Sequence, residues 1–161
     1  EVKYMTSDGA AVRSLGGMRV TPDQAAGPLP ETCAGVVLAG GTSWQTPGAE
    51  RIVPVVEEAL RRGLPVGAIC NAASFLAAHG FLNEVRHTGN TAEMLQEWGG
   101  ERYTGAARFE ERQAVRDGNI VTANGSGFLE FTREYLLALG ADTPEAIGAW
   151  YEFHKQGFYR A

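Results

Sequence analysis

Short, wholly apolar runs alternate along the chain with stretches whose apolar residues recur at helical spacing. Residues 35–39 and 64–69 are apolar throughout, which is typical of parallel strands that are covered on both faces. The intervening residues 47–62 predict a helix that stops at Gly63 and whose apolar face is made of Ile52, Val55, Val56, Ala59 and Leu60. This alternation predicts a mostly parallel sheet with helices on both faces.

The rest of the chain continues the alternation of strands, helices and tight turns. Asp117-Gly118 is a strong hairpin signal, and Thr143 before Pro144 marks the capped start of a helix. We predict strands at 2–6, 86–88, 108–115 and 119–123, a small hairpin excursion at 11–21, and helices at 71–79, 91–98, 127–139 and 144–153. One face of the helix at 127–139 is expected to hold Phe128, Phe131, Tyr135 and Leu139. Because no repeat or linker-like segment interrupts this order, we interpret residues 1–161 as a single domain.

Charge and composition narrow the classes of partner. The chain of 161 residues has a net charge of −5 and no Lys/Arg cluster in its sequence, which argues against a nucleic-acid partner. No apolar run approaches the roughly 18 residues that a membrane helix needs, so we expect no membrane partner. The two cysteines and three widely spaced histidines match neither a disulfide scaffold nor a zinc site, so we expect free thiols, no metal and a cytoplasmic location.

Cys70 stands where an apolar strand meets an Ala-rich helix. A sharp strand-to-helix turn of this kind lifts one side chain out of a sheet and needs small neighbours, which Ala68, Ala72 and Ala73 supply. The start of the following helix favours the thiolate form of the sulfur. Two readings stay open on this pattern alone, a reactive thiol and a small buried apolar residue. Cys33 precedes a strand and is read as structural.

A pocket is expected beside Cys70, because ligands of parallel sheets bind beyond the carboxyl ends of the strands. Gly40 and Gly41 close one strand at that edge, and Ser43 and Trp44 follow them. Trp44 either walls the pocket or packs in the core, and both readings stay open. The loop at 124–126 also follows a predicted strand end and is a candidate border of the pocket.

Four ordered strings together resemble the ThiJ/PfpI family, within the class I glutamine amidotransferase-like superfamily. They span nearly the whole chain and are Val37–Gly41, Ala68–Ala72, Arg86–Asn90, and Asn119–Gly125 followed by Glu130-Phe131. The resemblance implies a three-layer αβα sandwich of flavodoxin-like type. It further implies a small-molecule substrate, a homodimer and no external cofactor.

The resemblance also assigns roles to individual residues. Cys70 matches the family's nucleophile, and the backbone N–H groups of Gly41 and Asn71 match an oxyanion hole. His87 matches the position of a histidine that family members place near the thiol, where it takes a proton or holds the thiolate as an ion pair. Asn71 stands where the peptidase-like branch has a histidine, which argues against a peptidase.

The resemblance implies that the chain starts inside the family's second strand. The helix glutamate that contacts the cysteine in many members is therefore not identified in this sequence: either the start was cleaved or omitted, or the protein lacks part of the site. A separate N-terminal fragment of the same protein is one way to fill the sheet. Three functions stay open. They are a cysteine-dependent enzyme of glyoxalase-, deglycase- or amidase-like type, a redox-sensing or chaperone-like stress-response protein that uses Cys70, and an inactive relative.

Overall fold

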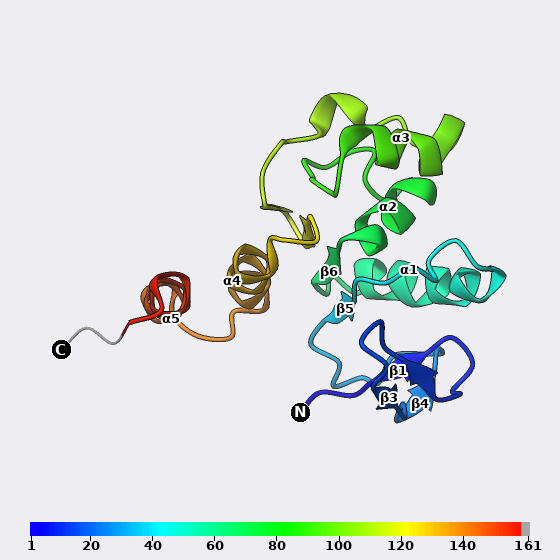
Figure 1. The fold of residues 1–161 in the computed structure, drawn as a ribbon, viewed down its shortest axis with the longest axis horizontal. Helices are drawn as coiled ribbons and strands as arrows, with labels where there is room; N and C mark the ends of the chain where they lie inside the picture. The colour runs from blue at the N-terminus through cyan, green and yellow to red at the C-terminus, as the bar shows by residue number, and fades with distance from the viewer. Residues whose placement is uncertain (159–161) are drawn as a thin grey trace.

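A four-stranded sheet lies at the centre of the computed structural model, which describes residues 1–158 (Figure 1). Its strand order is β5-β6-β8-β7. The strands β5 (Val36–Leu38), β6 (Val66–Ile69) and β8 (Ile120–Ala123) run parallel, and β7 (Ala114–Asp117) pairs antiparallel with β8. The predicted mostly parallel sheet is therefore confirmed.

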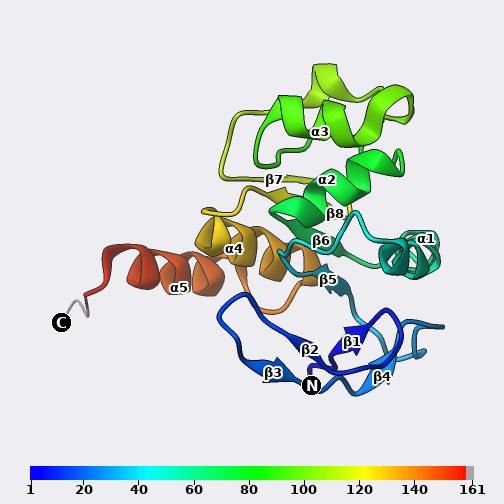
Figure 2. The ribbon, with the colours of Figure 1, turned by 45° about the vertical axis from the view of Figure 1, so that its right-hand side comes forward.

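Helices cover both faces of this sheet and make it the middle of three layers (Figure 2). Val66 and Ala68 of β6 pack in the core with the helices α1 (Val53–Arg61) and α2 (Asn71–Ala78). The alternate residue Gly67 faces α4 (Phe128–Leu139) on the other side, where a Cβ atom would lie 2.8 Å from both Phe131 and Tyr135. The αβα flavodoxin-like class is confirmed, because strand residues alternate between two covered faces.

The remaining elements follow the predicted order closely. A 3-10 turn at Pro47–Ile52 leads into α1, and 3-10 turns at Gly100–Arg102 and Ala106–Arg108 follow α3 (Ala92–Gly99). The capping predictions hold: Thr91 accepts a hydrogen bond from the N–H of Met94 at the start of α3, and Thr143 caps α5 (Pro144–Gln156). No helix within residues 1–158 is both long and apolar enough to cross a bilayer.

The first 25 residues form two small sheets beside β5. The short strands β1 (Met5–Thr6) and β4 (Gln24–Ala25) pair in parallel. The predicted hairpin excursion is confirmed, because β2 (Val12–Arg13) and β3 (Arg19–Val20) pair antiparallel across a tight turn.

Several local predictions were wrong. Residues 86–88 form only an isolated bridge, from His87 to Phe109, and the strand predicted from residue 108 begins at Ala114, because residues 106–108 turn in a 3-10 helix. β5 is covered on one face only, since Val37, between the buried Val36 and Leu38, remains 50% exposed. Phe128 in the first turn of α4 is 61% exposed and stands outside the buried helix face.

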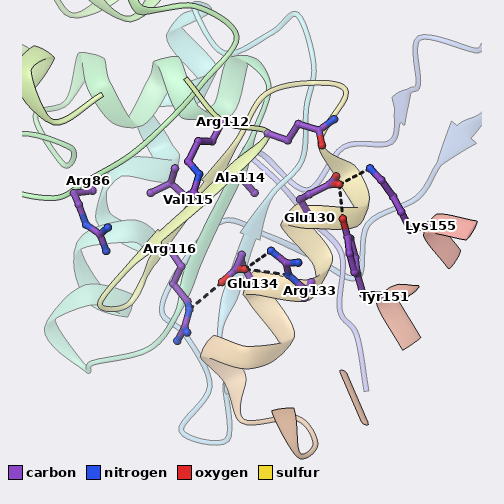
Figure 3. Close-up of a pocket in the computed structure, with 11 residues that line it drawn as sticks. Arg86, Arg112, Ala114, Val115, Arg116, Glu130, Arg133, Glu134, Tyr151 and Lys155 are labelled. Atoms are coloured by element: carbon purple, nitrogen blue, oxygen red, sulfur yellow. Dashed lines mark hydrogen bonds and ion pairs between the residues drawn. The ribbon is translucent and has the colours of Figure 1, made fainter. Parts of the chain in front are cut away.

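Helix α5 attaches to α4 through a buried carboxylate (Figure 3). Glu130 is only 9% exposed and accepts hydrogen bonds from the Tyr151 hydroxyl at 2.8 Å and the Lys155 ammonium at 2.6 Å. The guanidinium of Arg133 lies 4.5 Å from the centre of the Tyr151 ring, at cation–π distance. Burial raises the pKa of Glu130, but the hydrogen bonds from Lys155 and Tyr151 outweigh it and hold that pKa below its ordinary value.

Replacing Glu130 with Gln is expected to weaken the attachment of α5. It should also reduce the decrease in the free energy of unfolding as the pH falls. The pKa of Glu130 is lower in the folded state than its ordinary value of 4.5. The stabilisation by the carboxylate is therefore present above about pH 4.5 and is lost as the pH falls through the folded-state pKa. In urea unfolding, we expect E130Q to be less stable than wild type by about 1 kcal/mol at pH 7.

Measurements of the same two proteins between pH 7 and pH 3 complete this test. The difference in free energy of unfolding between the two proteins should decrease on acidification, because wild type loses the contribution of the ionised Glu130 carboxylate, which E130Q lacks at every pH. Glu152→Gln is the control, since Glu152 is an exposed residue of α5 that accepts a hydrogen bond from Gln156 in its own helix. A constant difference across the pH range would contradict the role given to Glu130.

The junction between β6 and α2 has an unusual backbone conformation. Cys70 has φ 62° and ψ −131°, and it is the only residue other than glycine with a positive φ in the described part of the chain. Its N–H donates to the carbonyl of Ala123 at 2.9 Å, and its own carbonyl accepts from the N–H of Ala73 at 3.0 Å. These two bonds hold a conformation that costs a residue with a Cβ atom about 1–3 kcal/mol.

Relief of this strain should be visible in the stability of two variants that both lack the sulfur. Cys70→Gly is expected to be more stable than Cys70→Ala, with a free energy of unfolding about 1 kcal/mol higher, because glycine adopts this conformation without a steric penalty. Thermal or urea denaturation of the two variants measures the difference. If Cys70→Ala is the more stable of the two, the junction does not store strain.

Candidate active site

The sulfur of Cys70 is contacted by a neutral amide. The Asn90 Nδ2 group donates to Cys70 Sγ at 3.4 Å and to Asn71 Oδ1 at 2.9 Å. The other end of that amide, Asn90 Oδ1, accepts a hydrogen bond of 3.0 Å from the N–H of Gly125. A backbone N–H can only donate, so Gly125 fixes the amide with its oxygen away from the sulfur and its NH₂ group toward it. Asn90 is therefore a hydrogen-bond donor to Cys70.

Two glycines bring backbone close to the same side chain. A Cβ atom on Gly40 would lie 3.1 Å from Cys70 Cβ and 3.8 Å from Sγ, and one on Gly125 would lie 3.3 Å from Sγ. These glycines follow β5 and β8, so the loops at the carboxyl ends of both strands meet at the sulfur. Gly40 and the loop at 124–126, which were predicted to border a pocket, thus lie against Cys70, and the pocket itself stays a prediction.

The two backbone N–H groups expected to form an oxyanion hole have no hydrogen-bond acceptor within the described residues. They belong to Gly41, which follows the close contact at Gly40, and to Asn71, the first residue of α2. The start of α2 also places partial positive charge beside Cys70, which precedes its first turn. The helix terminus is therefore favourable for negative charge at this point, and the oxyanion hole stays a prediction.

His87 does not contact the cysteine, contrary to the expected arrangement. Its Nδ1 lies 2.7 Å from the carbonyl of Val85 and therefore carries the proton, and its Nε2 accepts from the Tyr103 hydroxyl at 2.6 Å. The ring is fully buried and makes edge contacts with Tyr103 and Phe109. Burial lowers the pKa of His87, against the opposing effect of the bond to Val85, and keeps the ring neutral.

Trp44 packs against the core and also lies beside the loop at Gly40 and Gly41. Its two predicted roles, core packing and a wall of the pocket, are therefore compatible. Its ring centre lies 4.8 Å from that of Phe75, and its Nε1 donates to the carbonyl of Ala39 at 2.9 Å. A Cβ atom on Gly41 would lie 4.0 Å from that same Nε1. Ser43 is exposed, and its carbonyl accepts from the Thr46 hydroxyl at 2.7 Å. Ser43 has no contact with Cys70 in the part of the chain that is described.

The residue that sequence reasoning missed is Asn90. It ends the string at 86–90 and stands directly before the Thr91 helix cap, so the sequence alone indicates that it lies in a loop. The sequence gives no sign of its contact with Cys70, which lies 20 positions away. Cys33, read as structural, is half-buried against the core and donates from Sγ to the carbonyl of Gly35 at 3.5 Å.

The contacts define what this arrangement can do chemically. Cys70 Sγ accepts from Asn90 Nδ2 at 3.4 Å and donates to Asn71 Oδ1 at 3.8 Å, and within residues 1–158 neither a carboxylate nor an imidazole touches it. These amide contacts position the sulfur but supply no side chain to move a proton. No cluster of three or more metal-binding side chains is present in this same part of the chain.

Comparison with known proteins places the chain in a family. Residues 1–138 match the DJ-1/PfpI family. Two Bacillus subtilis (strain 168) proteins described as uncharacterized proteases are similar in sequence. YdeA is 37% identical over 92% of this chain and 74% of its own length, and YoaZ is 34% identical over 89% of this chain and 69% of its own length.

Solved structures agree with these sequence relatives. The DJ-1 superfamily protein Atu0886 from Agrobacterium tumefaciens has a TM-score of 0.86 and 36% identity, covering 98% of this chain and 84% of that one. A thiJ/pfpI family protein from Bacillus anthracis has a TM-score of 0.88 and 31% identity, covering 96% and 73%. The match to the family extends over most of the residues, and the predicted family resemblance is confirmed: the chain belongs to the DJ-1/PfpI family.

Proposed function

We propose that this protein is a cysteine-dependent enzyme of hydrolase or lyase type that acts on a small reactive carbonyl or amide, with Cys70 as the nucleophile. The observation that carries the proposal is the hydrogen bond from Asn90 Nδ2 to Cys70 Sγ, at the strand–helix corner where α2 begins. The description of two relatives as proteases is consistent with hydrolysis.

In the proposed first step, the thiolate of Cys70 adds to an electrophilic carbon. A carbon–sulfur bond forms, and the electron pair of the carbonyl bond moves to its oxygen. The N–H groups of Gly41 and Asn71 are proposed to stabilise that oxyanion. Asn90 holds the sulfur in place and donates to it until the new bond forms.

The proton balance favours a reactive aldehyde over an amide. Addition to an aldehyde gives a hemithioacetal whose oxygen needs one proton, which water can supply. Expulsion of an amine from an amide needs a positioned acid, and within residues 1–158 no acid contacts Cys70. The direct proton transfer expected of His87 is not part of the proposal, because both nitrogens of that ring are engaged elsewhere. A homodimer and a cytoplasmic location stay predictions of the family resemblance.

A substrate panel tests the proposal with a matched pair of cysteine variants. Wild type and Cys33→Ala are expected to convert methylglyoxal, glyoxal or a model amide. Cys70→Ala should lose at least about 1,000-fold in kcat/KM, because no other group can replace the nucleophile. Unchanged turnover in Cys70→Ala would overturn the proposal. Failure of every protein on every substrate, with stoichiometric oxidation of Cys70 by peroxide, would favour a redox sensor instead.

The role of Asn90 is tested by alkylation kinetics in a Cys33→Ala background, where Cys70 is the only thiol. Asn90→Asp keeps the acceptor for the Gly125 N–H but replaces the donor to sulfur with a carboxylate. We expect iodoacetamide to modify Cys70 about tenfold more slowly at pH 7, because the thiolate loses a donor and gains a like charge. Asn83→Asp is the control, since that side chain contacts Arg102 and Thr104. An equal or faster rate in Asn90→Asp would contradict the role.

A further inference from the structure

A polar cleft of about 500 Å³ runs along the outer edge of β7, and α4 and α5 form its other walls (Figure 3). β7 ends the sheet and has no partner strand on this side within the described residues. Five basic side chains from four segments of the chain line the cleft: Arg86, Arg112, Arg116, Arg133 and Lys155. Tertiary structure thus produces a basic cluster that is not visible in the sequence.

The direction of Arg116 follows from strand geometry. Ala114 and Arg116 are two residues apart in β7 and lie on the same side of the strand. Ala114 packs with the cluster around Phe131 of α4, so this side faces α4. Arg116 Nε reaches Glu134 of α4 at 3.3 Å, which confirms the direction. Arg112 stands in the bend before β7 and also lines the cleft.

The carboxylates near the cleft are shared between basic groups. Glu134 accepts from Arg116 and from Arg133, the latter at 2.9 Å. Glu110 lies 3.4 Å from Arg86 and 3.3 Å from Arg112. Exposed ion pairs at the longer of these distances contribute little to stability, so the arginines can turn toward a ligand at little energetic cost.

The balance of charge at the cleft is opposite to that of the whole chain. Lys155 is held tightly by the buried Glu130, and Asp117 lies 3.6 Å from Arg86. With Glu110 and Glu134 counted, four carboxylates face five basic groups, which leaves one net positive charge. The chain as a whole has a net charge of −5, so the cleft is where an anion would meet favourable charge.

We propose that this cleft binds a small organic dianion, a phosphate ester or a dicarboxylate. Both chemistries present paired oxygens that match the planar N–H fork of arginine, and Arg112 and Arg116 are the groups that would hold them. The volume falls within the roughly 300–1,000 Å³ of small-molecule sites. The cleft includes Tyr151 and Lys155, which lie beyond the residues 1–138 that match the family, and it contains no part of the Cys70 site.

Isothermal titration calorimetry of the full chain tests this proposal, with inorganic phosphate and succinate as probes and chloride at matched ionic strength. We expect saturable binding of one equivalent of at least one probe. The double variant Arg112→Gln, Arg116→Gln should bind at least about tenfold more weakly, because charge-assisted hydrogen bonds are lost. Arg13→Gln, Arg19→Gln is the matched control: it removes two exposed arginines of the β2–β3 hairpin, outside the cleft, and should bind as wild type does.

The outcomes separate the two chemistries and keep the test independent of catalysis. Binding of phosphate alone assigns a phosphate ester, and binding of succinate alone assigns a dicarboxylate. Cys70→Ala should bind the same probe with unchanged affinity, so failure of the proposed enzymatic function leaves this result unaffected. Circular dichroism of each variant checks that it is folded. The absence of saturable binding by either probe, or equal weakening in the hairpin control, would overturn the proposal.

Discussion

The hydrogen bond from the N–H of Cys70 to the carbonyl of Ala123 is the contact on which the site depends. It ties the end of β6 to the end of β8 while the chain turns into α2, and so helps to hold a backbone conformation that is unfavourable for cysteine. The sulfur consequently emerges between the loops that follow two neighbouring strands. Gly40 and Gly125 permit the close approach, because any side chain on either would press on Cys70.

Amide groups, and within residues 1–158 no carboxylate or imidazole, contact the sulfur of Cys70. Asn90 is held in one orientation by Gly125 and directs an N–H group at Cys70. The start of α2 adds partial positive charge at the same point. A thiolate held in this way is suited to adding to an electrophile, whereas reactions that need a side-chain proton donor have none in contact within residues 1–158. The arrangement therefore favours addition to an electrophile over reactions that need a side-chain acid.

Polar contacts hold the last helix in addition to its buried apolar residue Ile147. α5 attaches to α4 through Glu130, Tyr151 and Lys155, and the neighbouring arginines are distributed around shared carboxylates. Packing around Gly67 on the other side of α4 is apolar and close. The two faces of one helix thus serve different purposes: one covers the sheet, and the other carries the polar contacts that position the last helix.

Local sequence signals determined most of the secondary structure and the identity of the central residue. Apolar runs predicted β5 and β6, Thr91 and Thr143 marked helix starts, and the strand–Cys–helix string singled out Cys70, because these signals depend on neighbours in the chain. Contacts between distant residues were decided by tertiary packing alone. His87 packs in the core beside Tyr103, and Asn90, not His87, contacts the sulfur of Cys70. Arginines that are distant in the sequence come together where β7, α4 and α5 meet. The physical reason is that side-chain partners across an α/β sandwich follow from how its layers pack.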